Sequence, residues 1–275
     1  MKAAHPDALP IAGGTDVMVE INFDRHRPPA FLDLTRIPEL QEWGLDDGML
    51  RVGAGVTYTR LAGELGDRLP GLAMASRTVG SPQIRNRGTV GGNLGSASPA
   101  GDAHPALLAS RAIVELASTG GVRRLPVHEF FVGPKRNAMR NDELIAAFLI
   151  EPAQGPQQFS KVGTRNAMVI AVCSFALAIE PQRRRVGTGI GSAAPTPVGA
   201  PEPEKFIEGV LDEGNLWQKP APVGESALAR FGELVAAAAK PIDDVRGTAA
   251  YRRRALAVLA RRSFVWAWNE YLGAA

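Results

Sequence analysis

The sequence has almost no cysteine: Cys173 is the only one among 275 residues. A single thiol excludes an internal disulfide framework, a cysteine-ligated zinc site and an iron–sulfur cluster held by this chain alone. Burial of apolar side chains must therefore hold the fold together, and hydrophobic residues make up 45% of the chain. At about 150 residues per domain, the length predicts two domains.

Long hydrophobic runs are absent as well. The longest apolar stretch, residues 167–179, contains Ser174 and is shorter than the ~20 residues that a membrane-spanning helix needs. Residues 1–6 (MKAAHP) lack the apolar core of a secretory signal peptide. We therefore expect no membrane span and a cytoplasmic protein.

Charge of one sign is scarce, since the formal net charge is only +3. The arginines form short separate clusters, among them residues 183–185 and 252–254, and the chain has only three tyrosines. Neither an RNA-recognition motif nor a stacking platform for single strands is present. We expect no nucleic-acid partner, and we assign the arginine clusters to solvated faces and subunit contacts.

The common motifs of nucleotide and hydrolase sites are missing. The sequence has no GxxxxGK[ST] loop, no GxGxxG that opens a helix and no GxSxG elbow. His128 and Glu129 lack the second histidine of HExxH, and the four histidines are scattered. We expect ordinary surface or core histidines and no metal site.

Glycine and proline are abundant, with 30 and 21 residues, which predicts a turn-rich α+β fold. In the first half we expect Thr15 or Asp16 to cap a short helix, and Thr57 to cap another. Residues 88–100 are small and uncharged, which favours an ordered loop wrapped around a ligand. Residues 8–14 should form a short buried strand that runs into a glycine turn. The other expected strands are 30–34, 49–54, 111–116 and 143–151, and the expected helices include 17–21 and 72–78.

A change in composition at residues 152–156 (PAQGP) marks a linker. It divides the chain into predicted domains at 1–153 and 157–275. The second domain should contain strands followed by helices, which is typical of a separate α+β unit. Its expected strands are 159–164, 167–179 and 184–192, and its expected helices are 204–211, 225–239 and 247–271.

Two glycine doublets can carry chemistry. They lie in residues 12–16 (AGGTD) and 89–93 (TVGGN). Without Cβ atoms, the main chain can approach a ligand closely and turn its N–H groups toward an anion such as pyrophosphate. Thr89, Asn93 and Asp102 can add side-chain hydrogen bonds. Two such loops suit a dinucleotide, whereas either loop alone is most often a plain turn.

Several segments along nearly the whole chain form a pattern together with these doublets. The pattern resembles the FAD-binding medium subunit of molybdenum hydroxylases, the group of xanthine, carbon monoxide and nicotinate dehydrogenases. The segments are residues 12–16, 81–93, 98–102, 130–134, 143–145, 161–167, 194–197 and 251–253.

The resemblance implies an N-terminal FAD-binding domain of the vanillyl-alcohol-oxidase (PCMH) type, made of two α/β subdomains. It also implies a small C-terminal domain with a three-stranded antiparallel sheet and helices. The first glycine loop would wrap the diphosphate, and Gly80 with the second loop would complete the grip. The implied FAD-binding residues are Ile11, Ala12, Gly13, Gly14, Thr15, Asp16, Val17, Gly80, Thr89, Val90, Gly91, Gly92, Asn93, Asp102, Arg136, Ile145 and Lys161.

Three of these residues also have ordinary structural interpretations. By resemblance, Ile145 lies against the isoalloxazine ring, and Arg136 and Lys161 make polar contacts with FAD. Ile145 can equally be a buried strand residue, Arg136 a solvated loop arginine, and Lys161 an exposed lysine at a strand end. The resemblance assigns no catalytic residue and no metal ligand to this chain.

The implied function is electron transfer within a complex. A large partner with molybdopterin and molybdenum would hydroxylate an N-heterocycle, purine, aldehyde or carbon monoxide. A small partner with two [2Fe–2S] clusters would pass electrons to FAD on this chain, and NAD(P)⁺ or another acceptor would receive them. The expected assembly is a dimer of heterotrimers.

Two alternatives stay open: a self-contained flavin oxidase or dehydrogenase, and a non-catalytic assembly subunit. The sequence also departs from the family pattern, which has a helix before the first glycine loop, whereas ten residues precede Ile11 here. A longer native start or a neighbouring subunit would cover that edge. Relatives in benzoyl-CoA reductases carry an inserted four-cysteine cluster, which a chain with Cys173 alone cannot form.

Overall fold

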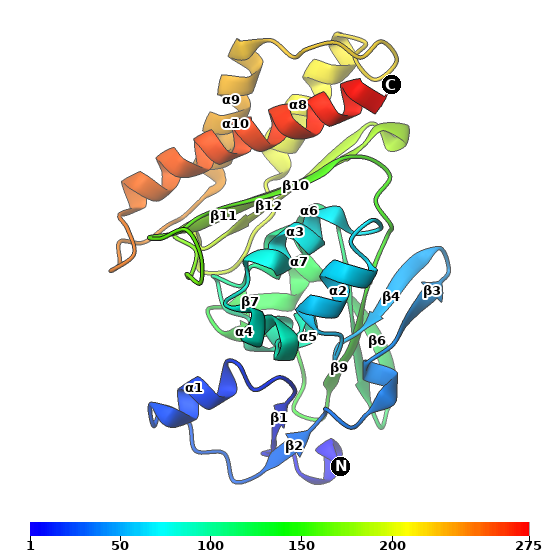
Figure 1. The fold of residues 1–275 in the computed structure, drawn as a ribbon, viewed down its shortest axis with the longest axis vertical. Coiled ribbons are helices and arrows are strands. Elements are labelled where there is room, and N and C mark those ends of the chain that lie inside the picture. The colour runs from blue at the N-terminus through cyan, green and yellow to red at the C-terminus, as the bar shows by residue number, and fades with distance from the viewer. Residues whose placement is uncertain (275) are drawn as a thin grey trace.

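The computed structural model describes residues 1–274 as an elongated molecule with an N-terminal and a C-terminal half (Figure 1). Two clusters of buried hydrophobic side chains fill it, one centred on each half. Helices and strands are mixed in both halves, so the predicted α+β fold is confirmed. Within residues 1–274, no helix is both long and apolar enough to cross a bilayer.

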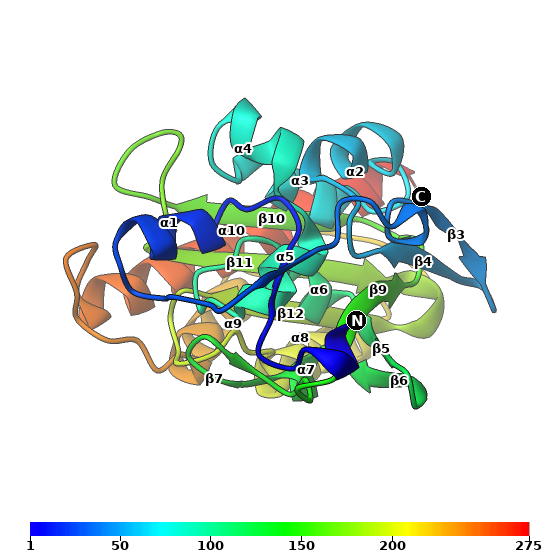
Figure 2. The ribbon, with the colours of Figure 1, turned by 90° about the horizontal axis from the view of Figure 1, so that it is seen from below.

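A small lobe at one end of the molecule contains the first glycine loop. β1 (Leu9–Ile11) and β2 (Phe31–Asp33) pair in parallel, and α1 (Val17–Asn22) lies on the connection between them. In Figure 2, which looks from below at the end of the molecule that is lowest in Figure 1, this lobe runs across the front. As predicted, the short first strand is followed by a glycine turn, in which Gly14 has a φ of 75°, although the strand is only half-buried. Short 3₁₀ helices, η1 (Lys2–Ala4) and η2 (Pro38–Leu40), flank the lobe.

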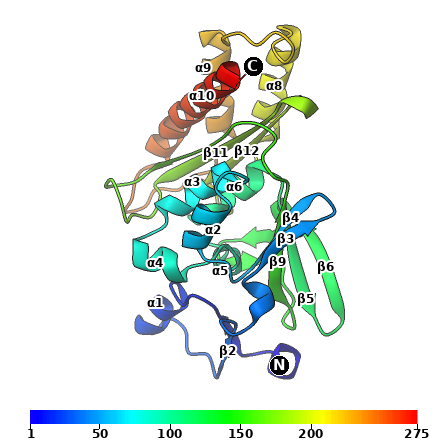
Figure 3. The same ribbon diagram turned by 45° about the vertical axis from the view of Figure 1, so that its right-hand side comes forward.

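A five-stranded antiparallel sheet, in the order β3-β4-β9-β5-β6, forms the body of the N-terminal half (Figure 3). Its strands at 49–54, 111–116 and 143–151 were expected from their apolar residues. The two edge strands were not expected, because their side chains are largely exposed and lack a clear apolar period. The bounds are β3 (Trp43–Asp46), β4 (Met49–Gly53), β5 (Ile113–Ser118), β6 (Gly121–Pro126) and β9 (Leu144–Ile150).

One helix, α5, occupies most of the segment 88–100 that was expected to be a loop. Ser81 and Thr89 cap two short helices, and Thr89 Oγ1 accepts the N–H of Gly92 at 2.8 Å. The prediction failed because glycine has a low helix propensity, which capping and burial override here. Thr57 caps its helix as expected, accepting from the N–H of Arg60. The helices are α2 (Tyr58–Glu64), α3 (Pro70–Thr78), α4 (Pro82–Arg87), α5 (Val90–Ser96) and α6 (Ala103–Ala109).

The rest of the N-terminal half is a short helix and a hairpin beside α5. The N–H of Lys135 donates to the Ala97 oxygen at 3.1 Å, and Asn137 Nδ2 donates to the Gly95 oxygen at 2.9 Å. These bonds hold the hairpin at the C-terminal end of α5. The elements are α7 (Val127–Phe130), β7 (Phe131–Gly133) and β8 (Arg136–Asn137).

The C-terminal half has a three-stranded antiparallel sheet, β10-β11-β12, followed by helices, as expected. The strand predicted at 167–179 begins only at Cys173. Residues before it form a loop in which Met168 has a φ of 50° and is 55% exposed. The bounds are β10 (Gln157–Val162), β11 (Cys173–Glu180), η3 (Pro181–Arg183), β12 (Arg185–Gly191), α8 (Pro201–Glu213), α9 (Glu225–Ala238) and α10 (Ala249–Ala274).

The three-stranded sheet is a shared layer between the two halves. Helices α3 and α6 of the N-terminal half cover one face, and α10 lies across the other (Figure 1). A Cβ atom on Gly189 would lie 2.0 Å from the oxygen of Pro105, so α6 rests directly on β12. This packing brings the end of β10 close to the start of α6, where the predicted site residues lie.

Candidate cofactor-binding site

The first glycine loop packs against the chain just before the second one. The first loop joins β1 to α1, and a Cβ atom on Gly13 would lie 2.0 Å from the main-chain oxygen of Arg87. Arg87 ends α4, immediately before the second loop. Gly13 is therefore needed for this close approach of main chains. Asp16 occupies the N-cap position of α1, but its exposed side chain makes no capping bond, contrary to expectation.

The second doublet uses its two glycines differently. A Cβ atom on Gly91 would lie 2.4 Å from the oxygen of Ala54 and 2.5 Å from its Cβ atom. Gly91 is buried, so its role is to pack α5 on the chain after β4. Gly92 is exposed, and the nearest atom to a Cβ there would be Thr89 Oγ1, at 3.1 Å. Of these two glycines, only Gly92 lies at the surface, and its N–H already donates to Thr89 Oγ1.

A buried ion pair joins three segments behind the loops. Lys161, in β10, donates from Nζ to Asp102 Oδ2 at 2.6 Å and to the Thr78 oxygen, at the end of α3, at 3.2 Å. Both side chains of the pair are less than 10% exposed. Burial raises the pKa of Asp102 to about 6, and Lys161 offsets only part of this rise.

Buried acceptors in this region lack donors. Asn93 Oδ1 and Asp102 Oδ1 have no hydrogen-bond partner, and each belongs to a chain segment that adjoins the exposed Gly92 or the ion pair. Buried polar atoms normally find partners, and leaving one unpaired costs about 1–3 kcal/mol. A dinucleotide such as FAD carries several hydroxyl and N–H donors. The residues present therefore fit such a ligand.

A buried tyrosine packs against the chain just before the second glycine loop. Tyr58 is 3% exposed, and its ring lies 3.3 Å from the Cβ position of Gly88. Burial raises its pKa well above the usual value, and the carboxylates of Asp102 and then Asp16 raise it further. Asp16 belongs to the first glycine loop. The two carboxylates therefore act electrostatically on the same phenol, although they are far apart in the sequence.

The remaining predicted residues lie around this centre at different distances. Gly80 has a φ of 44° and follows Thr78, so it lies next to the ion pair. Ile145 is buried in β9, and its Cδ1 atom lies 3.7 Å from the Cβ position of Gly95 in α5. Arg136 is exposed on β8, and the structure shows no contact between it and the ion pair.

Sequence reasoning missed one supporting residue, His104. Its ring is fully buried, lies 4.6 Å from Phe131, and has Nε2 at 3.1 Å from the Asn93 oxygen. Burial lowers its pKa to about 4, so the ring is neutral near pH 7. The only signal was its position two residues after Asp102.

Within residues 1–274, no three histidine, cysteine or acidic side chains gather as metal ligands would.

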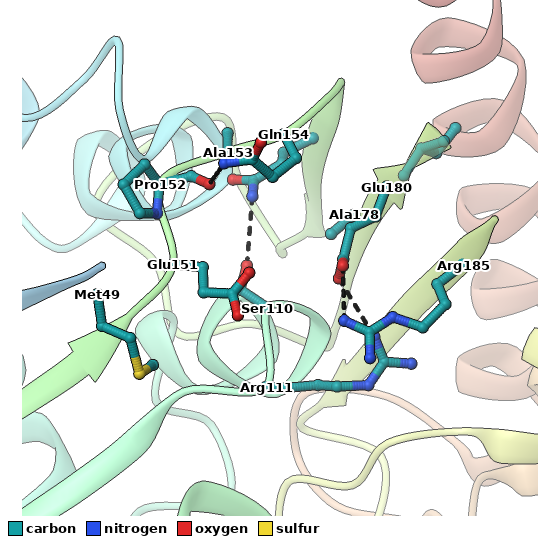
Figure 4. Close-up of a pocket in the computed structure, with 12 residues that line it drawn as sticks. Met49, Ser110, Arg111, Glu151, Pro152, Ala153, Gln154, Ala178, Glu180 and Arg185 are labelled. Carbon is teal, nitrogen blue, oxygen red and sulfur yellow. Dashed lines mark hydrogen bonds and ion pairs between the residues drawn. The ribbon is translucent and has the colours of Figure 1, made fainter. Parts of the chain in front are cut away.

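A separate hollow lies on another side of the boundary between the halves (Figure 4). Its volume is about 50 Å³, far below the ~300–1,000 Å³ of ligand pockets. Glu180 accepts from Arg185 at 2.6 Å and from Arg111 at 3.3 Å across it. We assign this hollow to packing between the halves.

Asp102 should make the stability of the fold depend on pH between about pH 4 and pH 6. Its pKa is about 6 in the fold and 3.8 in the unfolded chain, so the folded state holds more protons in this range. The free energy of unfolding therefore falls as the pH rises, by on the order of 3 kcal/mol for this group. Buried His104, with its pKa lowered to about 4, makes an opposite contribution over the same range, so Asp102 is read from the difference between two proteins. In urea unfolding, the stability of the wild type relative to Asp102→Asn should fall as the pH rises. The same pH dependence in both proteins would contradict the assignment.

Comparison with known proteins identifies the family. Residues 1–152 match the family described as FAD binding domain in molybdopterin dehydrogenase, and residues 158–267 match the CO dehydrogenase flavoprotein C-terminal domain. The nicotinate dehydrogenase FAD-subunit of Eubacterium barkeri is 34% identical over 182 residues, which span 64% of this chain and 61% of that relative. A putative xanthine dehydrogenase FAD-binding subunit of Escherichia coli is 28% identical over 270 residues, 94% of this chain and 88% of that one.

Solved structures agree with this fold. Reconstituted CO dehydrogenase from Oligotropha carboxidovorans has a chain that is 25% identical, with a TM-score of 0.86 and coverage of 96% of this chain and 91% of that one. Quinoline 2-oxidoreductase from Pseudomonas putida 86 shares the fold at 23% identity and a TM-score of 0.85, covering 98% and 92%. The chain belongs to the family of FAD-binding domains of molybdopterin dehydrogenases, and it is an FAD-carrying subunit of an oxidoreductase.

Proposed function

We propose that this chain is the electron-transfer subunit of a multi-subunit molybdenum hydroxylase, placed between an iron–sulfur partner and NAD(P)⁺. One observation carries the proposal. The first glycine loop packs against the chain just before the second loop, and Asn93 of the second loop lies beside Gly101, next to the buried Asp102–Lys161 pair and its unpaired acceptors. This arrangement suits a dinucleotide.

The residues divide into groups by what they offer to FAD. The first loop, residues 11–17, would hold the diphosphate, and Gly80 with residues 89–93 would complete the cofactor site. Asp102 and Asn93 would accept from hydroxyl or N–H groups of the cofactor. Lys161 would keep Asp102 ionised and in place. Ile145 would make an apolar contact with the cofactor, and Arg136 would make a polar one.

The electron-transfer role follows from what the chain can and cannot hold. When bound, FAD exchanges single electrons for electron pairs, while the protein supplies position and electrostatics. With Cys173 alone and buried, the chain cannot ligate a [2Fe–2S] cluster. The clusters, two of them, would therefore lie on a small partner subunit.

The complex would also contain a large subunit with molybdopterin and molybdenum, as a dimer of heterotrimers in the cytoplasm. Its substrate would be an N-heterocycle, because the two relatives described above are named for nicotinate and xanthine. Within this chain we assign FAD binding to a domain at residues 1–153. A second domain, at residues 157–275, would pack against it. Lys161 then reaches Asp102 from the second domain.

The proposal predicts that NADH or NADPH, added without oxygen to the FAD-loaded chain, bleaches the visible flavin absorbance, because transfer to NAD(P)⁺ runs backward. Nicotinate, xanthine and aldehydes should leave the flavin oxidised, since their oxidation needs the molybdenum partner. The measurement is rapid mixing of the isolated chain with each compound. Bleaching by an organic substrate alone would support a self-contained oxidase. A folded chain that takes up no FAD would support an assembly subunit.

A further inference from the structure

Helix α10 carries a buried arginine that the proposed function does not use. Arg252 is 2% exposed. Its Nη1 atom donates to the main-chain oxygens of Val172 at 2.6 Å and Ser192 at 2.5 Å, and its Nη2 atom donates to Asp244 Oδ1 at 2.5 Å. Burying a guanidinium is costly, and its carboxylate and carbonyl partners must offset that cost. Two of these partners are main-chain oxygens at the bases of loops.

The bond to the Val172 oxygen connects Arg252 to the segment that carries Lys161. The N–H of Val172 donates to the Val162 oxygen at 2.7 Å, which closes the loop between β10 and β11. Val162 directly follows Lys161, whose ammonium group binds Asp102 Oδ2. By holding Val172, the guanidinium fixes the end of β10 from which Lys161 projects.

The bond to the Ser192 oxygen connects Arg252 to the segment that carries Asp102. The N–H of Ser192 donates to the Pro99 oxygen at 2.8 Å, and Ser192 Oγ donates to the Ala171 oxygen at 2.6 Å. Pro99 lies in the segment that runs through Gly101 into Asp102. Ser192 has a φ of 59°, which costs free energy for a residue with a side chain. The bonds at Ser192, including that from Arg252, hold it in this conformation.

We propose that Arg252 is a positioning residue for the cofactor, because one guanidinium holds both the segment that carries Lys161 and the segment that carries Asp102. This inference rests on the proposed function, in which the pair belongs to the FAD site. Arginine suits the task because its planar fork presents several donors in fixed directions. A lysine at this position would keep the charge but could not reproduce the fork.

The test compares Arg252→Lys and Arg252→Met with Arg253→Met, whose parent residue is the exposed neighbour on the same helix. We expect the Kd for FAD to rise about ten- to a hundredfold in both Arg252 variants, the size usual for residues that orient a binding shell. The visible circular dichroism of bound flavin should change, while far-ultraviolet circular dichroism shows that Arg252→Lys is folded. Arg253→Met should match the wild type.

A second readout needs no FAD. Carbon-13 NMR of the Asp102 carboxyl should show its titration at higher pH in Arg252→Lys than in the wild type, because Lys161 is less well aligned. Unchanged FAD affinity, flavin spectrum and Asp102 titration in Arg252→Lys would overturn the inference, even with lower thermal stability. A wild-type chain that binds no FAD would overturn the proposed function and this inference with it. The two failures are therefore distinguishable.

Discussion

Replacing Gly91 by valine is expected to destabilise the fold by at least about 3 kcal/mol, the upper range for overpacking. The new side chain would meet the oxygen of Ala54 at 2.4 Å and its Cβ atom at 2.5 Å. These are main-chain and Cβ atoms at the end of β4, so no flexible side chain can move aside. Urea unfolding followed by circular dichroism measures the loss.

Gly92→Val is the matched control, since it adds the same side chain one residue along. The position is exposed, and the nearest atom is Thr89 Oγ1. We expect this variant to fold and to lose FAD, because the branched side chain blocks access to the main chain. Equal unfolding free energies for the two variants would contradict the different roles assigned to the two glycines.

Replacing Lys161 by methionine is expected to cost about 3–5 kcal/mol of stability at neutral pH and to weaken FAD binding strongly. The substitution keeps the apolar volume but leaves the Asp102 carboxylate buried without its cation. The loss should be smaller near pH 5, because Asp102 can then be neutralised by a proton.

Unfolding at the two pH values measures this effect, with Lys205→Met as the control because Lys205 is exposed on α8. A Lys161→Met variant with the stability and FAD affinity of the control would show that the ion pair supports neither the fold nor the site.

The candidate site was only partly readable from the sequence. The glycine doublets and Asp102 were found because their residue types and spacing form a local pattern. Which of the named residues touch FAD stays a prediction. The contact of Lys161 with Asp102 could not be derived from local patterns, because it depends on how α6 packs against the three-stranded sheet. The hydrogen bonds that connect Arg252 to the segments of Lys161 and Asp102 also join residues far apart in the sequence, so local patterns could not predict them either.

The errors in the predicted fold have physical causes too. The apolar run at 167–179 predicted one long strand, yet Met168 and Ile170 are exposed on a loop. Residues 90–96 looked like a loop because glycine is a poor helix former, while a threonine cap and the contact of Gly91 with Ala54 make them helical. Local propensity was overridden by tertiary contacts in both places.

The central claim is that FAD binds beside the two glycine loops of this chain, without a covalent link. The most direct measurement is the visible spectrum of the purified, FAD-incubated chain before and after acid precipitation, for the wild type and Gly92→Val. The account predicts one flavin per wild-type chain, released into the supernatant by acid, and little flavin on the folded variant. A folded wild-type chain that stays colourless, or a Gly92→Val chain that binds FAD equally well, would contradict it.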